Sequence, residues 1–307
     1  MLKRMSVLIV FSTMFPALYA QDKNFRWVRS EYNGVFFTPP AAEEYAGDPM
    51  PFYDETNKLF RLFYLRDRRP GSNKGDNGVN YHPISQVTTA DAIHYREIKD
   101  GAPILPYGED DPAFGTGSVI KDDNNGEYVL FYTGHKFDNE ARQNREVVLR
   151  AYSTDGVNWN KNVMRNETEK WNILPPDGYS KADFRDPCVV KVADGDYRML
   201  VSAINGEGRA VLVEYKSAGL WDWELVGDFK TDAEGHFYEC TDVFRMGGLW
   251  YLLYSDMDGS ERCVKYYVAE TYEGLKTAAK PYRMEGMLDG KSFYAGKTAS
   301  DGEKRYI

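Results

Sequence analysis

The sequence is poor in cysteine and histidine, the residues that most often build disulfide frameworks and metal sites. Its three cysteines, Cys188, Cys240 and Cys263, are too few for a disulfide scaffold, and the four histidines are scattered without metal-ligand spacing. Neither Cys188 nor Cys240 has a His or Lys beside it to lower its thiol pKa. We therefore expect small, buried packing cysteines, no bound metal and no cofactor.

Positive charge is also in deficit. Lys and Arg number 38 against 47 Asp and Glu, which gives a formal net charge of −9 at pH 7. A negatively charged surface argues against nucleic acid and anionic membranes as partners. It suits a neutral substrate, such as an oligosaccharide or a polysaccharide.

Long apolar runs are missing as well. The N-terminal stretch at residues 7–15 follows Lys3 and Arg4 and ends in Ala-Leu-Tyr-Ala at residues 17–20, too short a run to span a bilayer. This pattern predicts a signal peptide over residues 1–20 and export to the periplasm or the medium. The remaining residues, 21–307, are expected to form one domain without a membrane span.

Aromatic residues, by contrast, are abundant, with 23 Tyr and 16 Phe. Some of them lie in four strand-like runs, each preceded by a turn rich in Asp, Asn or Gly: residues 60–65, 128–133, 197–202 and 250–255. A fifth unit begins near residues 291–294 and re-enters a strand at 304–307.

Two further stretches, residues 88–95 and 152–159, repeat a Thr/Ser-x-Asp turn followed by an aromatic residue. Repeats of this size predict an all-β fold, a five-bladed β-propeller with an incomplete last blade. A large β-sandwich is the alternative, but it does not explain the repeated order of turn, aromatic strand and acid.

Three acidic residues stand in short marked contexts at the entrance to such strands. They are Asp48 in Gly-Asp-Pro, Asp186 in Arg-Asp-Pro and Glu239 in Tyr-Glu-Cys. Taken singly, each is explained by a turn or a salt bridge. Taken together, they predict innermost strands that deliver acids to one pocket, where crowding separates their pKa values. Two carboxyl groups facing one sugar are what glycoside hydrolysis requires.

The order of Asp-Pro, Arg-Asp-Pro and Glu-Cys resembles the catalytic propeller of glycoside hydrolase family 32, the invertase, inulinase and levanase group. The resemblance runs from about residue 36 to residue 307. Residues 81–83, 89–95, 115–118 and 292–295 support it.

The resemblance implies a glycosidase that cleaves β-fructofuranosyl bonds in sucrose, inulin or levan by a retaining double displacement. Asp48 would be the nucleophile and Glu239 the acid/base, while Asp186 would stabilise the transition state with Arg185 setting its charge. Further residues are expected to line the sugar pocket: Tyr81, His82, Phe114, Thr116, Ser118 and Tyr238. For His82, a hydrogen-bonding role in a loop is an equal expectation.

The sequence departs from the family pattern in three ways. Residues 45–50 read Tyr-Ala-Gly-Asp-Pro-Met where the family has Trp-Met-Asn-Asp-Pro-Asn, and Thr241 replaces the usual Pro after Glu-Cys. The family's C-terminal β-sandwich is also expected to be absent. The alternatives are a family 43-like inverting arabinofuranosidase or xylosidase, a fructosyltransferase, and a non-catalytic carbohydrate-binding propeller.

Overall fold

The computed structural model describes residues 37–39, 44–68, 82–138, 143–161, 163–231, 236–256, 262–279, 287–288 and 293–307. The predicted signal segment and Tyr81 lie outside these ranges. Within them, regular structure is almost entirely β-strand, and no helix is long and apolar enough to cross a membrane.

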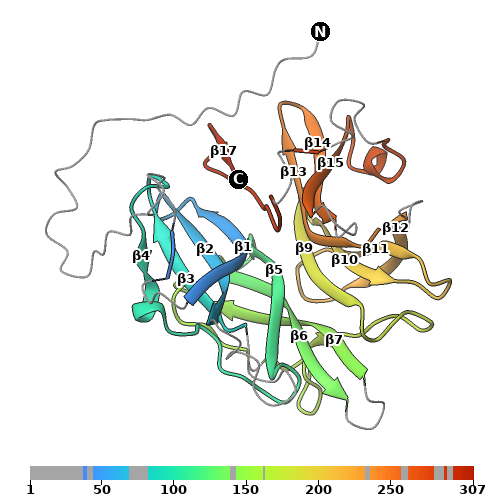
Figure 1. The fold of residues 1–307 in the computed structure, drawn as a ribbon, viewed down its shortest axis with the longest axis horizontal. Helices are drawn as coiled ribbons and strands as arrows, with labels where there is room; N and C mark the ends of the chain where they lie inside the picture. Colours follow the sequence, from blue (N-terminus) through green and yellow to red (C-terminus); the bar gives the residue numbers. More distant parts are fainter. Residues whose placement is uncertain are drawn as a thin grey trace, which may run out of the picture.

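The strands form four antiparallel sheets arranged as blades around a common centre, with β1, β5, β9 and β13 innermost (Figure 1). Each sheet follows chain order from its inner strand outward. The first contains β1 (Glu44–Asp54), β2 (Leu59–Arg68), β3 (Ile84–Thr89) and β4 (Arg96–Glu97); the second contains β5 (Ala113–Lys121), β6 (Tyr128–Asp138), β7 (Gln143–Ser153) and β8 (Asn172–Ile173). The third contains β9 (Phe184–Ala193), β10 (Asp196–Ile204), β11 (Ala210–Ser217) and β12 (Glu224–Thr231); the fourth contains β13 (Tyr238–Met246), β14 (Leu249–Asp256) and β15 (Cys263–Ala269).

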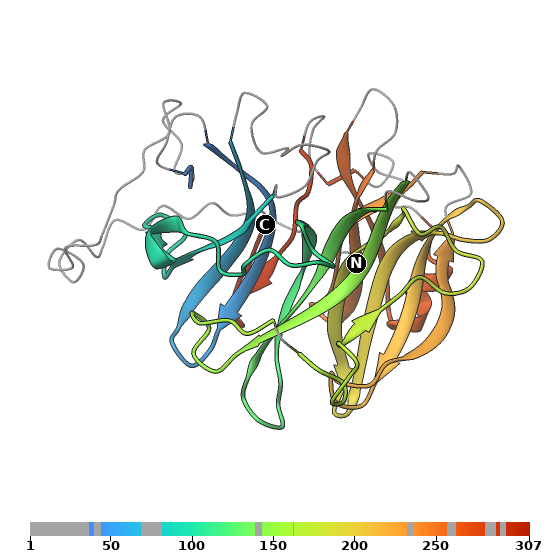
Figure 2. The same ribbon diagram turned by 90° about the horizontal axis from the view of Figure 1, so that it is seen from below.

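Two short strands follow these blades, β16 (Ala299–Ser300) and β17 (Arg305–Tyr306), and they pair with each other. The chain leading into them lies between the first and fourth blades, and β16 contacts β1. Two 3₁₀ turns, η2 (Ile98–Gly101) and η3 (Glu273–Lys276), complete the described elements. Seen side on, the long strands of the blades run between the two faces of the molecule (Figure 2).

The four predicted aromatic strands are confirmed as β2, β6, β10 and β14, the second strand of each blade. The predicted turns precede them for local reasons. Gly247 and Gly248 both have positive φ, 60° and 86°, which a two-residue hairpin turn requires. In the first blade, the Asp54 carboxylate accepts the backbone N–H groups of Thr56 and Asn57, so the side chain closes the turn.

The repeated Thr/Ser-x-Asp turns have the same hydrogen bonds in the first and second blades. Asp91 Oδ1 accepts the N–H groups two and three residues ahead at 2.9 and 2.8 Å, and Asp155 Oδ1 does the same at 2.8 and 2.7 Å. These bonds, with two from Asn158 and Ser153 side chains, outweigh burial and lower the pKa of Asp155. The repeat seen in the sequence is therefore a repeat of turn chemistry.

The apolar core is divided among the spaces between neighbouring blades. One cluster joins the first and second blades around Phe63 and Leu130, a second joins the second and third blades around Phe131 and Val201, and a third joins the third and fourth blades around Leu252. Strand β3 is buried along its whole length, so the first blade is covered on both faces at this strand. This packing fixes the inner strands relative to one another.

Candidate active site

The innermost strand of each blade is interrupted by a register shift at the same level. The shifts enclose Asp48 in β1, Thr116 in β5, Asp186 in β9 and Cys240 in β13. Such bulges bend a strand and re-aim a side chain, and they are common beside active sites.

Three of these bulge residues have a positive φ, a backbone conformation that residues other than glycine seldom adopt. The φ angles are 41° at Asp48, 60° at Asp186 and 50° at Cys240. Ala295, in the segment that leads to β16, has a φ of 56°. Strained backbone of this kind is usually maintained at a functional site.

Asp186 is buried on the axial side of β9 and connects three blades. Its Oδ2 accepts the backbone N–H of Cys240 at 2.8 Å, and its own N–H donates to Thr133 Oγ1 at 2.9 Å. Burial raises its pKa to about 6, and the charge of Glu239 acts in the same direction against the opposing effect of Arg185. Asp186 is therefore protonated more readily than an ordinary surface carboxyl group.

Both oxygens of Glu239 are held by other side chains. Arg185 Nη2 donates to Oε1 at 2.6 Å, Arg185 Nε donates to the same oxygen at 3.2 Å, and the Tyr294 hydroxyl donates to Oε2. The Glu239 side chain remains 14% exposed, so it is not closed off from solvent. Its orientation is fixed from the third blade, by Arg185, and from the C-terminal segment, by Tyr294.

Arg185 is itself positioned by several contacts. Its Nη1 lies 3.3 Å from Glu146 Oε2 of β7, and its guanidinium carbon lies 4.2 Å from the centre of the Phe237 ring. Glu146 also accepts the Phe184 N–H at 2.8 Å. Burial lowers the pKa of Arg185, but the carboxylates of Glu146, Asp186 and Glu239 raise it by a larger amount. Arg185 is therefore a permanent cation.

Asp48 faces the same group of charges from β1. Burial raises its pKa, and the nearby charge of Glu239 raises it further, while His82 and Lys297 oppose this increase. His82 Nδ1 lies 2.5 Å from Asp67 Oδ1. The structure therefore brings the three acids predicted from the sequence into one electrostatic environment, with His82 at its edge.

Four other residues predicted to line the sugar pocket are placed differently. Phe114 and Tyr238 have no exposed surface, so neither ring is presented to the pocket. Phe114 stacks on Tyr107 at 5.3 Å between ring centres, and Tyr238 packs edge-on against Tyr254 at 4.8 Å. Both are core residues, because strand alternation turns them into the space between blades.

Thr116 and Ser118 both lie on β5, and Ser118 connects two blades. Thr116 is buried at the bulge, and its carbonyl accepts the Thr133 hydroxyl at 3.0 Å. The Ser118 hydroxyl donates to Pro187 O and accepts the Val189 N–H, both at 2.9 Å. Ser118 therefore joins β5 to β9 and lines the axial cavity, whereas Thr116 does not.

The predicted buried cysteines are confirmed, with consequences for the site. Cys188 and Cys240 are buried and free, and burial raises the pKa of each thiol, to about 12 for Cys188. Neither is a nucleophile near neutral pH. In the described part of the chain, no group of three or more His, Cys, Asp or Glu side chains is placed to hold a metal ion.

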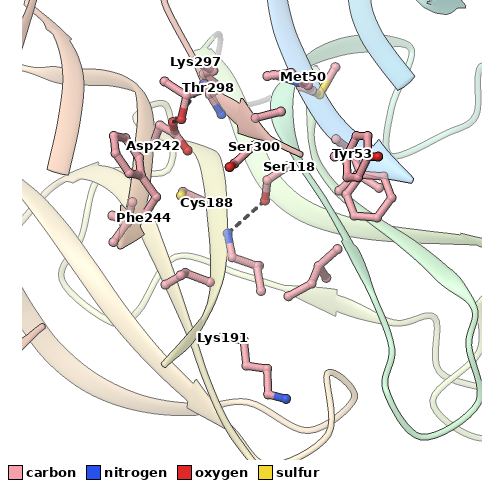
Figure 3. A pocket seen from close by; sticks show the side chains of 18 of the residues that line it. Met50, Tyr53, Ser118, Cys188, Lys191, Asp242, Phe244, Lys297, Thr298 and Ser300 are labelled. Atoms are coloured by element: carbon pink, nitrogen blue, oxygen red, sulfur yellow. Dashed lines mark hydrogen bonds between the residues drawn. The ribbon is translucent and has the colours of Figure 1, made fainter. Parts of the chain in front are cut away.

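A cavity of about 320 Å³ lies along the axis and is lined by the inner strands of all four blades and by the C-terminal segment. Figure 3 shows Lys297, Thr298 and Asp242 grouped at one end and Lys191 at the other. Asp242 Oδ2 accepts the Thr298 N–H at 2.9 Å and the Thr298 hydroxyl at 2.6 Å.

Sequence reasoning missed Tyr294, Lys297, Asp242 and Glu146. A signal for three of them was present in an internal repeat. Residues 293–297, Phe-Tyr-Ala-Gly-Lys, have the spacing of residues 238–242, Tyr-Glu-Cys-Thr-Asp. When the two segments are compared position by position, Tyr294 corresponds to Glu239 and Lys297 corresponds to Asp242.

An all-β propeller whose inner strands bring three carboxyl groups and a partly buried arginine into one electrostatic environment has the architecture of a propeller glycosidase. The family model described as "Glycosyl hydrolases family 32 N-terminal domain" matches residues 60–307. The chain therefore belongs to glycosyl hydrolase family 32. Asp48 lies just outside the matched residues.

Individual relatives agree with this assignment. The chain is 27% identical to a sucrose-6-phosphate hydrolase of Escherichia coli over 74% of this chain and 50% of that protein. It is 28% identical to a raffinose invertase of Escherichia coli over 73% of this chain and 49% of that protein. It thus spans about half the length of these curated relatives.

The fold is shared with a solved structure from the same family. The Bombyx mori GH32 β-fructofuranosidase BmSUC1 superimposes with a TM-score of 0.64 and 24% identity, covering 85% of this chain and 53% of that one. A mutant of that enzyme was solved in complex with sucrose, and it matches with a TM-score of 0.62 and 24% identity over the same shares.

Proposed function

We propose that this protein hydrolyses β-fructofuranosyl bonds by a retaining double displacement. The observation that carries the proposal is the convergence of Asp48, Asp186 and Glu239 at matching bulges of three innermost strands. Glu239 is held in one orientation by hydrogen bonds to both of its oxygens. Asp48 is near enough to Glu239 for the charge of Glu239 to raise its pKa. This arrangement suits an acid/base and a nucleophile that act on one anomeric carbon.

Asp48 is the proposed nucleophile because the β1 bulge turns it toward the acid cluster. It must be ionised to attack, and the nearby His82 and Lys297 lower its pKa while burial raises it. Asp48 attacks the anomeric carbon and the glycosidic bond breaks, so that a fructosyl–Asp48 ester forms. The leaving oxygen takes its proton from Glu239.

Glu239 then acts in reverse, removing a proton from water as that water attacks the ester and releases fructose. The hydrogen bonds from Arg185 and Tyr294 hold its carboxylate in one orientation through both steps. The charge of Asp186 stabilises the oxocarbenium-like transition state. We expect the carboxyl groups of Asp48 and Glu239 to stand about 5–5.5 Å apart, as retention requires.

The proposed substrates are sucrose and fructans of the inulin or levan type. The activities that the relatives are named for, those of a sucrose-6-phosphate hydrolase and a raffinose invertase, support a saccharide with a terminal fructosyl unit. We also propose export to the periplasm or the medium, on the strength of the N-terminal pattern at residues 1–20. N-terminal sequencing of the secreted protein should begin at Gln21.

We further infer that the segment from Tyr294 onward is the inner part of a fifth blade. Its residue Ala295 has the same backbone conformation as Asp186 and Cys240, and its Lys297 lines the axial cavity with the other inner strands. A crystal structure should place this segment between β1 and β13, completing five units around the axis.

The decisive experiment measures fructose release from sucrose, inulin and levan, with arabinan and xylan oligosaccharides as controls. The wild-type protein should release fructose, and Asp48→Asn should abolish the release. Carbon-13 NMR of C2 in the first product should show the β-anomer, because retention preserves the configuration of the cleaved bond.

Other products would contradict the proposal in distinct ways. Release of arabinose or xylose with inversion would assign the protein to the inverting propeller glycosidases. Fructosyl transfer to sugar without net hydrolysis would identify a transferase. Saccharide binding without any product would identify a carbohydrate-binding propeller.

A further inference from the structure

Glu146 is a buried carboxylate beside the acid cluster that the proposed mechanism does not use. It lies on β7 of the second blade, is 5% exposed, and pairs across the sheet with His135 of β6. A buried charge is costly unless other groups compensate it. Burial raises the pKa of Glu146, but its contacts with His135, Arg185 and the Phe184 N–H lower it below its ordinary value. Glu146 is therefore held as an anion.

The two oxygens of Glu146 have different partners. Oε2 accepts the backbone N–H of Phe184 at 2.8 Å and lies 3.3 Å from Arg185 Nη1, while Oε1 lies 3.2 Å from His135 Nδ1. The His135 ring is confined at its other nitrogen, because a Cβ added at Gly115 would lie 2.5 Å from Nε2. His135 therefore keeps the Glu146 carboxylate directed at β9.

These contacts belong to a seam between the second and third blades that surrounds Arg185. The Phe184 N–H donates to Glu146, and the Asp186 N–H donates to Thr133 Oγ1 of β6, so the backbone is fixed on both sides of Arg185. Strands β6 and β7 both contact β9, the inner strand of the next blade (Figure 1). The second blade thus fixes the backbone of Arg185 as well as its guanidinium group.

Arg185 meets Glu239 in a less common arrangement. Arginine and a carboxylate often pair two nitrogens with two oxygens in parallel hydrogen bonds. Here Nη2 and Nε of Arg185 both donate to Oε1 of Glu239, at 2.6 and 3.2 Å, and Oε2 accepts from Tyr294 instead. The third nitrogen, Nη1, is directed to Glu146. Because two N–H groups occupy Oε1, Oε2 is the oxygen that can carry the catalytic proton.

We propose that Glu146 is a positioning residue that holds Arg185 on one oxygen of Glu239 and so keeps the other oxygen available for proton transfer. This inference rests on the proposed function, because it takes Glu239 as the acid/base. Glu146 acts through Arg185 and need not touch the substrate. Its side chain must reach Arg185 Nη1 and the Phe184 N–H at once, so its length matters more than its charge.

The first test compares crystal structures of two variants without substrate. Glu146→Asp keeps the charge but shortens the side chain, so it cannot reach both partners. Glu146→Gln keeps the length, with its carbonyl oxygen toward Arg185 and its amide group toward His135 Nδ1. In Glu146→Asp, Arg185 should no longer place both Nε and Nη2 within hydrogen-bonding distance of Glu239 Oε1. In Glu146→Gln both contacts should remain.

Steady-state kinetics provide the second test. With sucrose, Glu146→Asp should lower kcat by about tenfold or more and change KM by less than about threefold, because a misplaced acid/base slows chemistry more than binding. Glu146→Gln should keep kcat within about threefold of wild type.

Azide separates a misplaced Glu239 from a distorted pocket. The leaving group of a nitrophenyl β-fructofuranoside needs little protonation. Azide then attacks the anomeric carbon of the fructosyl–Asp48 ester without a base, which forms fructosyl azide and releases the Asp48 carboxylate. With this substrate and azide, Glu146→Asp should recover to within about threefold of wild type. A variant that stays slow under these conditions has a defect outside Glu239, and that result would contradict the proposal.

Asp183→Asn is the matched control. Asp183 Oδ1 lies 3.5 Å from the same Arg185 Nη1, but its side chain is 40% exposed, and exposed ion pairs contribute little. This variant should leave kcat and both contacts between Arg185 and Glu239 unchanged.

Two outcomes would overturn the proposal, namely both contacts intact in Glu146→Asp or an equal loss of kcat in Glu146→Gln. The Gln variant still tests the proposal if the Asp variant does not fold, because broken contacts there would show that side-chain length does not hold Arg185. A wild-type protein that releases no sugar would contradict the proposed function alone, since the crystal structures would still decide how Glu146 holds Arg185.

Discussion

Individual side chains at the centre of this protein are held in states that ordinary surface residues do not reach. Asp186 combines a positive φ, full burial and a pKa of about 6, while Glu239 has both oxygens occupied by Arg185 and Tyr294. These features oppose stability and favour function, because a strained, buried carboxyl group is maintained only by the surrounding packing.

Replacing Glu239 by Gln separates catalysis from binding. The amide keeps the shape of the carboxylate and can still accept from Arg185, but it cannot deliver or take a proton. We expect kcat to fall by at least about 100-fold while saccharide affinity stays within a few-fold. Steady-state kinetics and calorimetric titration would measure the two effects, with the exposed Glu207→Gln as the control. Unaltered turnover would exclude Glu239 as the acid/base.

The raised pKa of Asp186 predicts how stability depends on pH. The folded state binds the Asp186 proton more tightly than the unfolded state, whose pKa is near 3.8, so this group's contribution is complete below pH 3.8 and is lost as pH rises toward 6. In urea unfolding at pH 4 to 7, the stability of Asp186→Asn relative to wild type should therefore improve with rising pH up to about 6. A difference that does not vary with pH would mean that Asp186 is not perturbed.

At the level of strands, the bulges in the inner strands redirect side chains and so allow a repeated sheet to form a site. Each inner strand pairs with its neighbour before and after the register shift, and the shift encloses Asp48, Thr116, Asp186 or Cys240. The β5 bulge contributes no acid. Instead it supplies the Gly117 carbonyl that holds Lys297.

Gly117 is required by close backbone approach. A Cβ added there would lie 1.9 Å from the Phe131 carbonyl oxygen, and that backbone belongs to the paired strand β6. Gly117→Ala should lower the free energy of unfolding by about 3 kcal/mol or more. Gly195→Asn is the control, because a Cβ there meets nothing within 4 Å, and it should cost about 1 kcal/mol or less. Chemical denaturation would measure both, and equal losses would contradict the close approach.

For the whole molecule, the question is what joins the C-terminal segment to the other blades. Several of the connections are hydrogen bonds. They run from Ala295 N–H to the Ser255 hydroxyl, from Thr298 to Asp242 and from Lys297 to Gly117. Together they connect this segment to the fourth and second blades across the axis.

Asp242→Ala should loosen this segment selectively. It removes the acceptor for both Thr298 bonds, and charge-assisted bonds of this kind contribute about 1.5–3 kcal/mol each. We expect amides of residues 294–306 to exchange with solvent at least about tenfold faster, while those of β9 to β12 remain protected. Hydrogen exchange with mass spectrometry would show this, with the exposed Asp222→Ala as the control. Uniform loss of protection would indicate global destabilisation instead.

The sequence by itself determined the repeat and the three acids. Aromatic strands and Asp or Gly turns are local features, and hairpin turns depend on side chains a few residues apart, so β2, β6, β10 and β14 could be predicted. Asp48, Asp186 and Glu239 could be identified because short motifs mark them. Tyr81 and the signal segment lie outside the described residues and remain predictions.

Only the tertiary structure decided which neighbours complete the site. Phe114 and Tyr238 face the core because strand alternation, shifted by a bulge, sets the direction of each side chain. Arg185 meets Glu239, and Lys297 meets Gly117 180 residues away. Such contacts depend on how whole blades pack around the axis, and burial at that axis produces the charge environment that short motifs do not encode.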